Sequence, residues 1–120
     1  MKFSQCPCSG KSLARLVRPA ILSTLAREGM MHGYDLLRHL GKMEIFQNVV
    51  PDAGGIYKLL KKMEEEELIV SGKIVAGERA DKRPFRITPR GRGCLKNWHA
   101  TLESYHQDLG IFIKSLWKKT

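Results

Sequence analysis

The sequence lacks the long apolar run that a membrane-spanning helix needs, because no stretch approaches about 18 consecutive apolar residues. It also lacks a signal-peptide pattern, since no apolar core follows the basic start within residues 1–11. Cysteine is scarce: only Cys6, Cys8 and Cys94 occur, and an odd number without an export signal argues against a disulfide framework. We therefore expect a cytoplasmic protein with reduced thiols.

Catalytic patterns are missing as well. The sequence has no glycine-rich loop of the phosphate-cradling kind, no metal-ligand constellation and no nucleophile paired with a base at useful spacing. We therefore predict that the protein is not an enzyme and has no cofactor or metal. One alternative stays open, because thiolates bind metals and react with oxidants. The candidates for such a role are Cys6, Cys8 and Cys94, although they lack the C-x-x-C spacing of zinc sites.

Acidic side chains are few relative to basic ones. The 120 residues hold 21 Lys and Arg against 12 Asp and Glu, which gives a formal net charge of +9. Such a surplus on a small surface favours a polyanionic partner, with nucleic acid first and an anionic membrane second. The length fits one compact domain with a long appended helix, and a hydrophobic share of 42% is enough to build its core.

Apolar residues recur at helical spacing in the first half of the chain. Pro19 allows only a break or a restart, Gly29 is typical of the residue after a helix, and Asp52 is a candidate N-cap. Three short helices in about 50 residues match a helix-turn-helix. We predict a helical turn at 12–17, a first helix at 19–28, a second at 34–41 with Tyr34, Leu36, Leu37 and Leu40 on its apolar side, a loop at 42–51 and a third helix at 52–66.

A change to β-branched residues follows the acidic run at 64–67. Leu68–Val70 and Ile74–Val75 together have the composition of a strand, and Phe85–Ile87 alternates inward and outward like a second one. A polar, basic loop at 76–84 joins them, so we predict a β-hairpin. Helices followed by such a hairpin are typical of a winged helix, and the predicted fold class is mainly α with a small β-hairpin.

A long last helix is predicted from Thr88, a good N-cap, and Pro89 at its first position to about residue 118. Its apolar residues step by three and four, which is a strict heptad seam. A helix of about 45 Å is too long to bury that seam on its own body, so we predict a homodimer. The domains are an irregular arm at 1–11, a winged helix-turn-helix at 12–88 and a dimerisation helix at 89–120. The predicted interface comprises Leu95, Trp98, Leu102, Tyr105, Leu109, Phe112 and Leu116.

Basic residues gather on the third helix and the hairpin. Gly54 and Gly55 leave free N–H groups at a helix start, where phosphate binds. Residues 73–92 hold seven basic and two acidic residues, a net charge of +5, which favours duplex DNA over a membrane. A merely solvated surface is the plainer interpretation. The predicted DNA-binding residues are Gly54, Gly55, Tyr57, Lys58, Lys61, Lys62, Lys73, Arg79, Lys82, Arg83 and Arg86.

Three segments carry a family resemblance: residues 32–36 (HGYDL), Gly55, Ile56 and Tyr57 with the apolar positions that follow to residue 69, and residues 85–91 (FRITPRG). In this order and at these intervals they resemble the PadR family of winged-helix transcriptional regulators, over roughly residues 19–102. Two positions depart from the family's pattern, since Lys58 replaces a common proline and Glu67 replaces a common glycine at the helix end.

The resemblance implies a dimer that binds a near-palindromic operator in double-stranded DNA, usually as a repressor relieved by a small molecule or a stress signal. It also implies an effector pocket at Trp98, Tyr105 and Phe112, although an aromatic seam is more often plain dimer core. The alternative function is a winged-helix interaction module whose basic face meets an acidic protein or a membrane.

Overall fold

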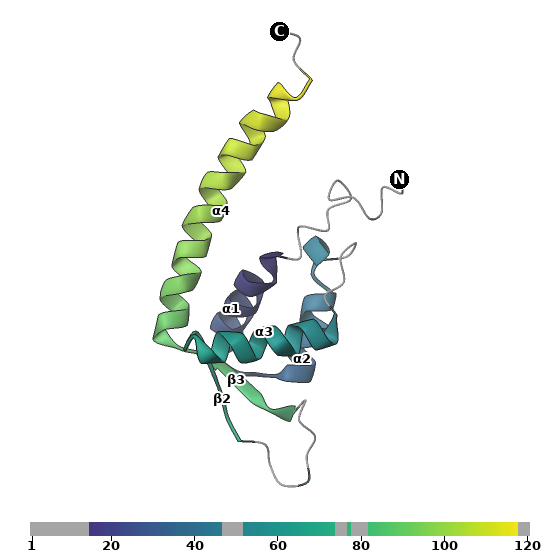
Figure 1. Ribbon diagram of the computed structural model, residues 1–120, viewed down its shortest axis with the longest axis vertical. Helices are drawn as coiled ribbons and strands as arrows, with labels where there is room; N and C mark the ends of the chain where they lie inside the picture. The colour runs from purple at the N-terminus through teal and green to yellow at the C-terminus, as the bar shows by residue number, and fades with distance from the viewer. Residues whose placement is uncertain (1–14, 47–51, 74–76, 78–81, 118–120) are drawn as a thin grey trace.

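The computed structural model describes residues 15–46, 52–73, 77 and 82–117, so the predicted arm at 1–11 lies outside the described residues. Figure 1 shows the first three α-helices gathered with the strands in one body, from which the last helix projects as a long arm. The predicted fold class is confirmed. The elements are α1 (Val17–Glu28), β1 (Met31–His32), α2 (Gly33–Gly41), η4 (Glu44–Phe46), α3 (Ala53–Glu65), β2 (Ile69–Ser71), β3 (Pro84–Ile87) and α4 (Pro89–Ser115).

Helix α1 begins before Pro19 rather than at it. Arg15 and Leu16 form a tight turn that runs directly into the helix, so the predicted break at Pro19 is wrong. Pro19 fits because it lies in the first turn, where its missing N–H loses no hydrogen bond. At the other end Gly29 closes the helix as predicted, with a φ of 82° and its N–H donating to the Leu25 carbonyl at 2.9 Å.

Helix α2 ends at Gly41 as predicted. Leu36 and Leu40 are fully buried, but Tyr34, which the apolar pattern places inward, is 42% exposed. That placement is wrong because Tyr34 lies on the outer side of the first turn. There the Arg38 guanidinium lies 5.7 Å from the centre of its ring, a cation–π contact.

The core lies between α1, α2, α3 and one side of the sheet. Residues 44–46, predicted as part of a loop, form the 3-10 turn η4, which buries Phe46 completely. The apolar stripes of α1 and α3 face inward as their spacing predicts. The largest fully buried side chains of the described residues are Phe46, Ile21, Leu22, Leu25, Leu36, Leu40, Leu60, Met63, Ile69 and Thr24.

Helix α3 ends in a left-handed turn at Glu67. Its φ is 62°, and within the described ranges it is the one residue other than glycine with a positive φ. The turn lets the Leu68 N–H donate to the Met63 carbonyl at 3.0 Å, a helix ending that usually contains glycine. The left-handed conformation costs an L-residue about 1 kcal/mol.

Replacing Glu67 with glycine is therefore expected to raise the free energy of unfolding by about 1 kcal/mol. Urea denaturation of the full chain measures this change. The matched control is Glu65→Gly, because Glu65 has ordinary helical backbone and glycine there is expected to lower the free energy of unfolding by about 1 kcal/mol. Equal losses in both variants would show that the left-handed turn carries no strain.

The sheet has three antiparallel strands in the order β1-β3-β2. The β2–β3 hairpin is confirmed, with Ile69 opposite Ile87 and Val70 opposite Arg86. The predicted strand segment at 74–75 lies outside the described residues. Strand β1 was not predicted, because two residues are too few to show the alternation that reveals a strand. It ties the segment before α2 to the free edge of β3.

Helix α4 begins as predicted, with Pro89 at its first position and the Thr88 hydroxyl accepting the Gly91 N–H at 3.0 Å. Gly91 is required by contact, because a side chain there would collide with the Leu68 carbonyl oxygen. The 27 residues of α4 span about 40 Å. Among the described residues, no helix has the length and apolar character needed to cross a membrane.

Candidate nucleic-acid interface

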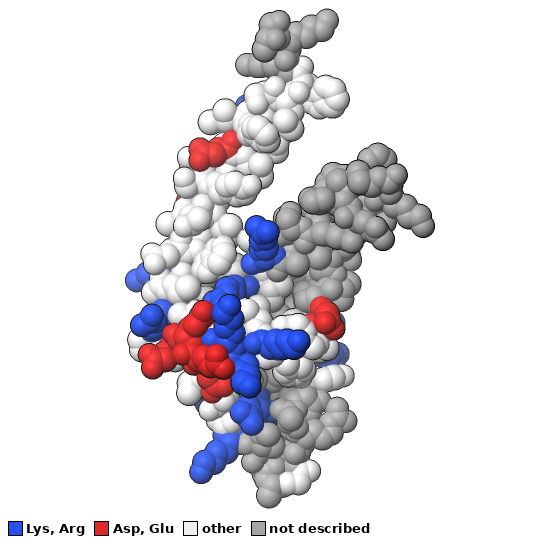
Figure 2. Space-filling model, in the orientation of Figure 1, with Lys and Arg blue, Asp and Glu red and all other residues white. Residues whose placement is uncertain are grey.

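Helix α3 presents a basic strip on the side opposite its core contacts. Ile56, Leu60 and Met63 are buried, so the positions between them face outward. Figure 2 shows Lys and Arg side chains in a band that crosses α3 and continues toward β2 and β3. The exposed basic residues of α3 are Lys58, Lys61 and Lys62.

The N-terminus of α3 is already capped. The Asp52 carboxylate accepts the N–H groups of Gly54 and Gly55, each at 3.3 Å, so the predicted N-cap is confirmed. The prediction that these two N–H groups are free for phosphate is wrong, because a carboxylate of this chain occupies the same positions. Contact of Gly54 or Gly55 with DNA stays a prediction.

Tyr57 lies half-covered at the inner edge of the basic strip. The residue is 36% exposed, and its ring packs over Gly33, the first residue of α2. This side of the ring therefore joins α3 to α2.

The hairpin adds basic residues next to α3. Arg86 pairs with Val70 and is exposed with it, while their neighbours Phe85 and Ile69 are buried, so the two faces of the sheet alternate. The remaining predicted contacts in this segment are Lys73, Lys82 and Arg83, which are exposed, and Arg79, which lies outside the described residues.

An acidic cluster borders the basic band at the end of α3 that lies beside the start of α4 (Figure 2). Two of its carboxylates, from the run at 64–67, are used within the fold. Glu64 accepts hydrogen bonds from the Ser71 N–H at 3.0 Å and from the Ser71 hydroxyl at 2.5 Å, which joins α3 to β2. Glu66 accepts from the Arg18 guanidinium at 2.7 Å, which joins α3 to α1. These bonds fix the basic strip relative to the hairpin.

The Arg18–Glu66 pair makes stability depend on pH. The hydrogen bond from Arg18 lowers the pKa of Glu66 below its usual value of 4.5, and desolvation acts in the opposite direction. A pKa lowered by folding gives stability that is present above 4.5 and lost as the pH falls through the folded-state pKa. Glu66→Gln is therefore expected to lower the urea midpoint at neutral pH.

In acid, well below pH 4.5, Glu66→Gln and the unmodified chain are expected to have converging midpoints. Glu65→Gln removes a neighbouring exposed carboxylate and is the matched control. A difference between Glu66→Gln and the unmodified chain that stays constant from neutral to acidic pH would argue against this role of the ion pair.

Helix α4 divides into two parts. Near its start Leu95 and Trp98 are partly buried and pack against the core of their own chain. Further along, large apolar side chains are uncovered: Phe112 is 58% exposed, and Trp117, which follows the end of the helix, is 93% exposed. Of the other predicted interface residues, Leu102 and Leu109 are half-buried, and Tyr105 and Leu116 are exposed.

The predicted effector residues are spread along α4, and two of them line different hollows. Trp98 lines a mostly apolar cavity of about 250 Å³ between α1, η4 and α4, together with Pro19, Ala20 and Ile45. Tyr105 lines a separate shallow depression on α4. Phe112 lies further along the arm, where it is exposed.

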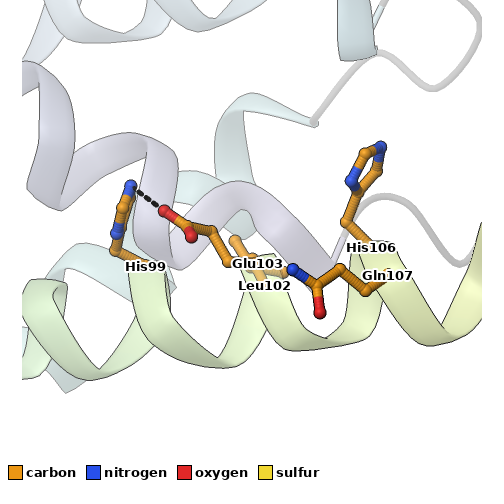
Figure 3. Close-up of a pocket in the computed structure, with 5 residues that line it drawn as sticks. All are labelled: His99, Leu102, Glu103, His106 and Gln107. Carbon is orange, nitrogen blue, oxygen red and sulfur yellow. Dashed lines mark ion pairs between the residues drawn. The ribbon is translucent and has the colours of Figure 1, made fainter.

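A second depression on α4 is lined by His99, Leu102, Glu103, His106 and Gln107 (Figure 3). Glu103 turns toward His99, with 3.0 Å between its Oε1 and the Nε2 of His99, whereas His106 stands apart from this pair.

Of the cysteines, Cys94 is half-buried, and Cys6 and Cys8 lie outside the described residues. In the described ranges no three His, Cys, Asp or Glu side chains come together as metal ligands.

Sequence reasoning missed Gly33 as part of this site. Its N–H donates to the Arg83 carbonyl at 3.1 Å, and its Cα faces the Tyr57 ring, so it touches both the hairpin and α3. Gly33 belongs to residues 32–36, one of the segments that carry the family resemblance, but this segment indicated a helix start and not a contact with α3.

Comparisons with known proteins agree with this geometry. The family model described as "Transcriptional regulator PadR-like family" matches residues 21–97. A PadR-like transcriptional regulator from Bacillus cereus is similar in structure, with 21% identity, a TM-score of 0.71 and coverage of 86% of this chain and 96% of that one. Bacillus subtilis PadR in complex with operator DNA has 27% identity and a TM-score of 0.58, covering 84% of this chain and 60% of that one. No curated protein matches the sequence.

Proposed function

We propose, from the premise that the chain belongs to the PadR-like family of transcriptional regulators, that it is a homodimeric repressor. In this proposal it binds a near-palindromic operator in double-stranded DNA and is released by a small-molecule or stress signal. Members of the family are regulators and not enzymes, in agreement with the prediction of no enzymatic activity. The observation that carries the proposal is the basic, exposed side of α3 next to a basic hairpin.

The dimensions of α3 suit the major groove of DNA. Its 13 residues span about 20 Å, and its exposed side offers Lys58 and Lys61 to bases or phosphates. Arg83 and Arg86 on the hairpin extend the positive surface to the neighbouring backbone. The similar Bacillus subtilis protein was solved in complex with operator DNA, which supports operator binding by this chain.

The uncovered end of α4 supports a homodimer. Phe112 is exposed on a helix that leaves its own body, Leu116 and Trp117 are exposed just beyond the end of this helix, and such a large apolar patch favours association. A two-fold dimer binds two related half-sites, which is why the operator is expected to be near-palindromic.

Release by an effector is supported by the cavity that Trp98 lines. Its walls come from both α1 and α4, so a bound apolar molecule would contact the DNA-binding body and the arm together. Such a ligand favours one angle between the two parts and thereby changes the spacing of the two α3 helices in the dimer. A dimer with the wrong spacing binds its operator weakly, which relieves repression.

Selection of genomic DNA by the purified full chain tests this proposal. We expect recovery of a small set of fragments that share a near-palindromic sequence, with the chain's own promoter region as the first fragment to examine. Steep loss of binding with added salt is expected, because Lys and Arg release counterions from phosphate. Equal recovery of all fragments would overturn sequence-specific regulation and favour an interaction module with a basic face.

A further inference from the structure

Gly33 lies where three parts of the proposed DNA-binding surface meet. It is the first residue of α2, it is buried, and its N–H donates at 3.1 Å to the carbonyl of Arg83, the residue just before β3. A Cβ atom placed on Gly33 would lie 3.1 Å from Cε1 of Tyr57 on α3 and 3.5 Å from the Phe85 ring on β3. The residue therefore sits between α3 and the hairpin with almost no room for a side chain.

The backbone of Gly33 does not itself require glycine. The positive φ values of described glycines occur at Gly29 and Gly77, so Gly33 has a conformation that alanine adopts freely. Alanine also has a higher helix propensity than glycine. Glycine is therefore needed at this position because it leaves room for the Tyr57 ring. The contact between Gly33 and this ring sets how closely α3 approaches α2 and the hairpin.

We propose that Gly33 is a positioning residue for DNA recognition, which holds the Tyr57 ring and thereby fixes the spacing between the recognition helix α3 and the hairpin. This inference rests on the proposed function, since the spacing matters only if α3 and the hairpin contact one duplex. A methyl group at 3.1 Å from an aromatic carbon displaces the ring by a few tenths of an ångström. Groove contacts depend on such distances because hydrogen bonds weaken steeply outside their narrow range.

The first test compares Gly33→Ala with Gly41→Ala in the full chain. Gly41 is the last residue of the same helix, and no described atom lies within 4 Å of where its Cβ would be. The probe is a labelled duplex that the unmodified chain recovers from a random-sequence pool, followed by fluorescence anisotropy. Gly33→Ala is expected to raise the Kd for this duplex about tenfold, as loss of one good groove contact does, and Gly41→Ala is expected to leave it unchanged.

A double-mutant cycle separates positioning from general destabilisation. If Gly33 acts through the Tyr57 ring, Gly33→Ala adds no further loss of affinity in a chain that already carries Tyr57→Ala. Thermal unfolding is recorded for each variant, because a structural effect alone would lower the melting temperature without this coupling. If Gly33→Ala does not fold, the double variant is compared with Tyr57→Ala, and equal affinities are still expected because the ring has been removed.

Two results would overturn the inference: an unchanged Kd for Gly33→Ala, or a further loss of affinity when Gly33→Ala is added to Tyr57→Ala. Failure of the unmodified chain to recover any duplex would instead refute the proposed function, and the inference with it. The failure of the inference and the failure of the proposed function are distinguishable, because only an unmodified chain that binds a selected duplex can show that the inference about Gly33 is wrong.

Discussion

Changing both Lys58 and Lys61 to glutamine is expected to raise the Kd for the operator about 100-fold to 1000-fold at physiological salt. Both side chains are exposed on the same side of α3, and a dimer loses four positive charges from its DNA-binding surface. Each lost phosphate contact lowers the slope of log affinity against log salt by about 1. Fluorescence anisotropy with a selected duplex at several salt concentrations measures both quantities.

The matched control for this change is Lys96→Gln with Lys114→Gln. These two exposed lysines lie on α4 away from its apolar seam, so the control removes the same charge from the arm. Its affinity is expected to fall much less, because charges far from the phosphates are screened over about 10 Å. Equal losses in the two double variants would mean that net charge, and not its placement on α3, governs binding.

Changing Tyr105 and Phe112 to glutamate is expected to convert the dimer into monomers and to abolish tight operator binding. Both side chains are more than half exposed on the seam of α4. Burying an aromatic side chain contributes about 1.5–3 kcal/mol, so the loss of four such side chains from a dimer weakens association by at least about ten-thousandfold. Sedimentation equilibrium measures the monomer–dimer constant directly.

Ala100→Glu with Gln107→Glu is the control for the seam. These two exposed residues lie seven positions apart, as Tyr105 and Phe112 do, on the side of α4 opposite the seam, so the same two charges are added to the same helix at the same spacing. This control is expected to remain dimeric. Monomers in both double variants, or dimers in both, would contradict assembly through the seam.

The arrangement of α3 was predictable because its helical spacing decides which side faces the core. Ile56, Leu60 and Met63 are buried and the lysines between them are exposed, as the spacing indicates. The capping residues Asp52 and Thr88 were predictable for a similar reason, since a cap depends on residues two or three positions away.

Contacts between distant segments were not predictable in this way. Nothing local shows that Tyr57 lies over Gly33, because the contact depends on how α2 and α3 cross. Strand β1 forms only because β3 offers an edge at the right distance. The heptad seam likewise predicted one continuous apolar stripe, but a stripe does not show that Leu95 and Trp98 pack on the chain's own core while Phe112 stays uncovered.

The most direct test of the central claim compares the purified full chain on two duplexes: a fragment recovered by genomic selection and a scrambled duplex of the same length and base composition. Anisotropy titrations are run on both at low and at physiological salt. The account predicts binding of one dimer, at least about a thousandfold tighter to the selected duplex, with affinity falling steeply as salt rises. Equal affinity for both duplexes would contradict it.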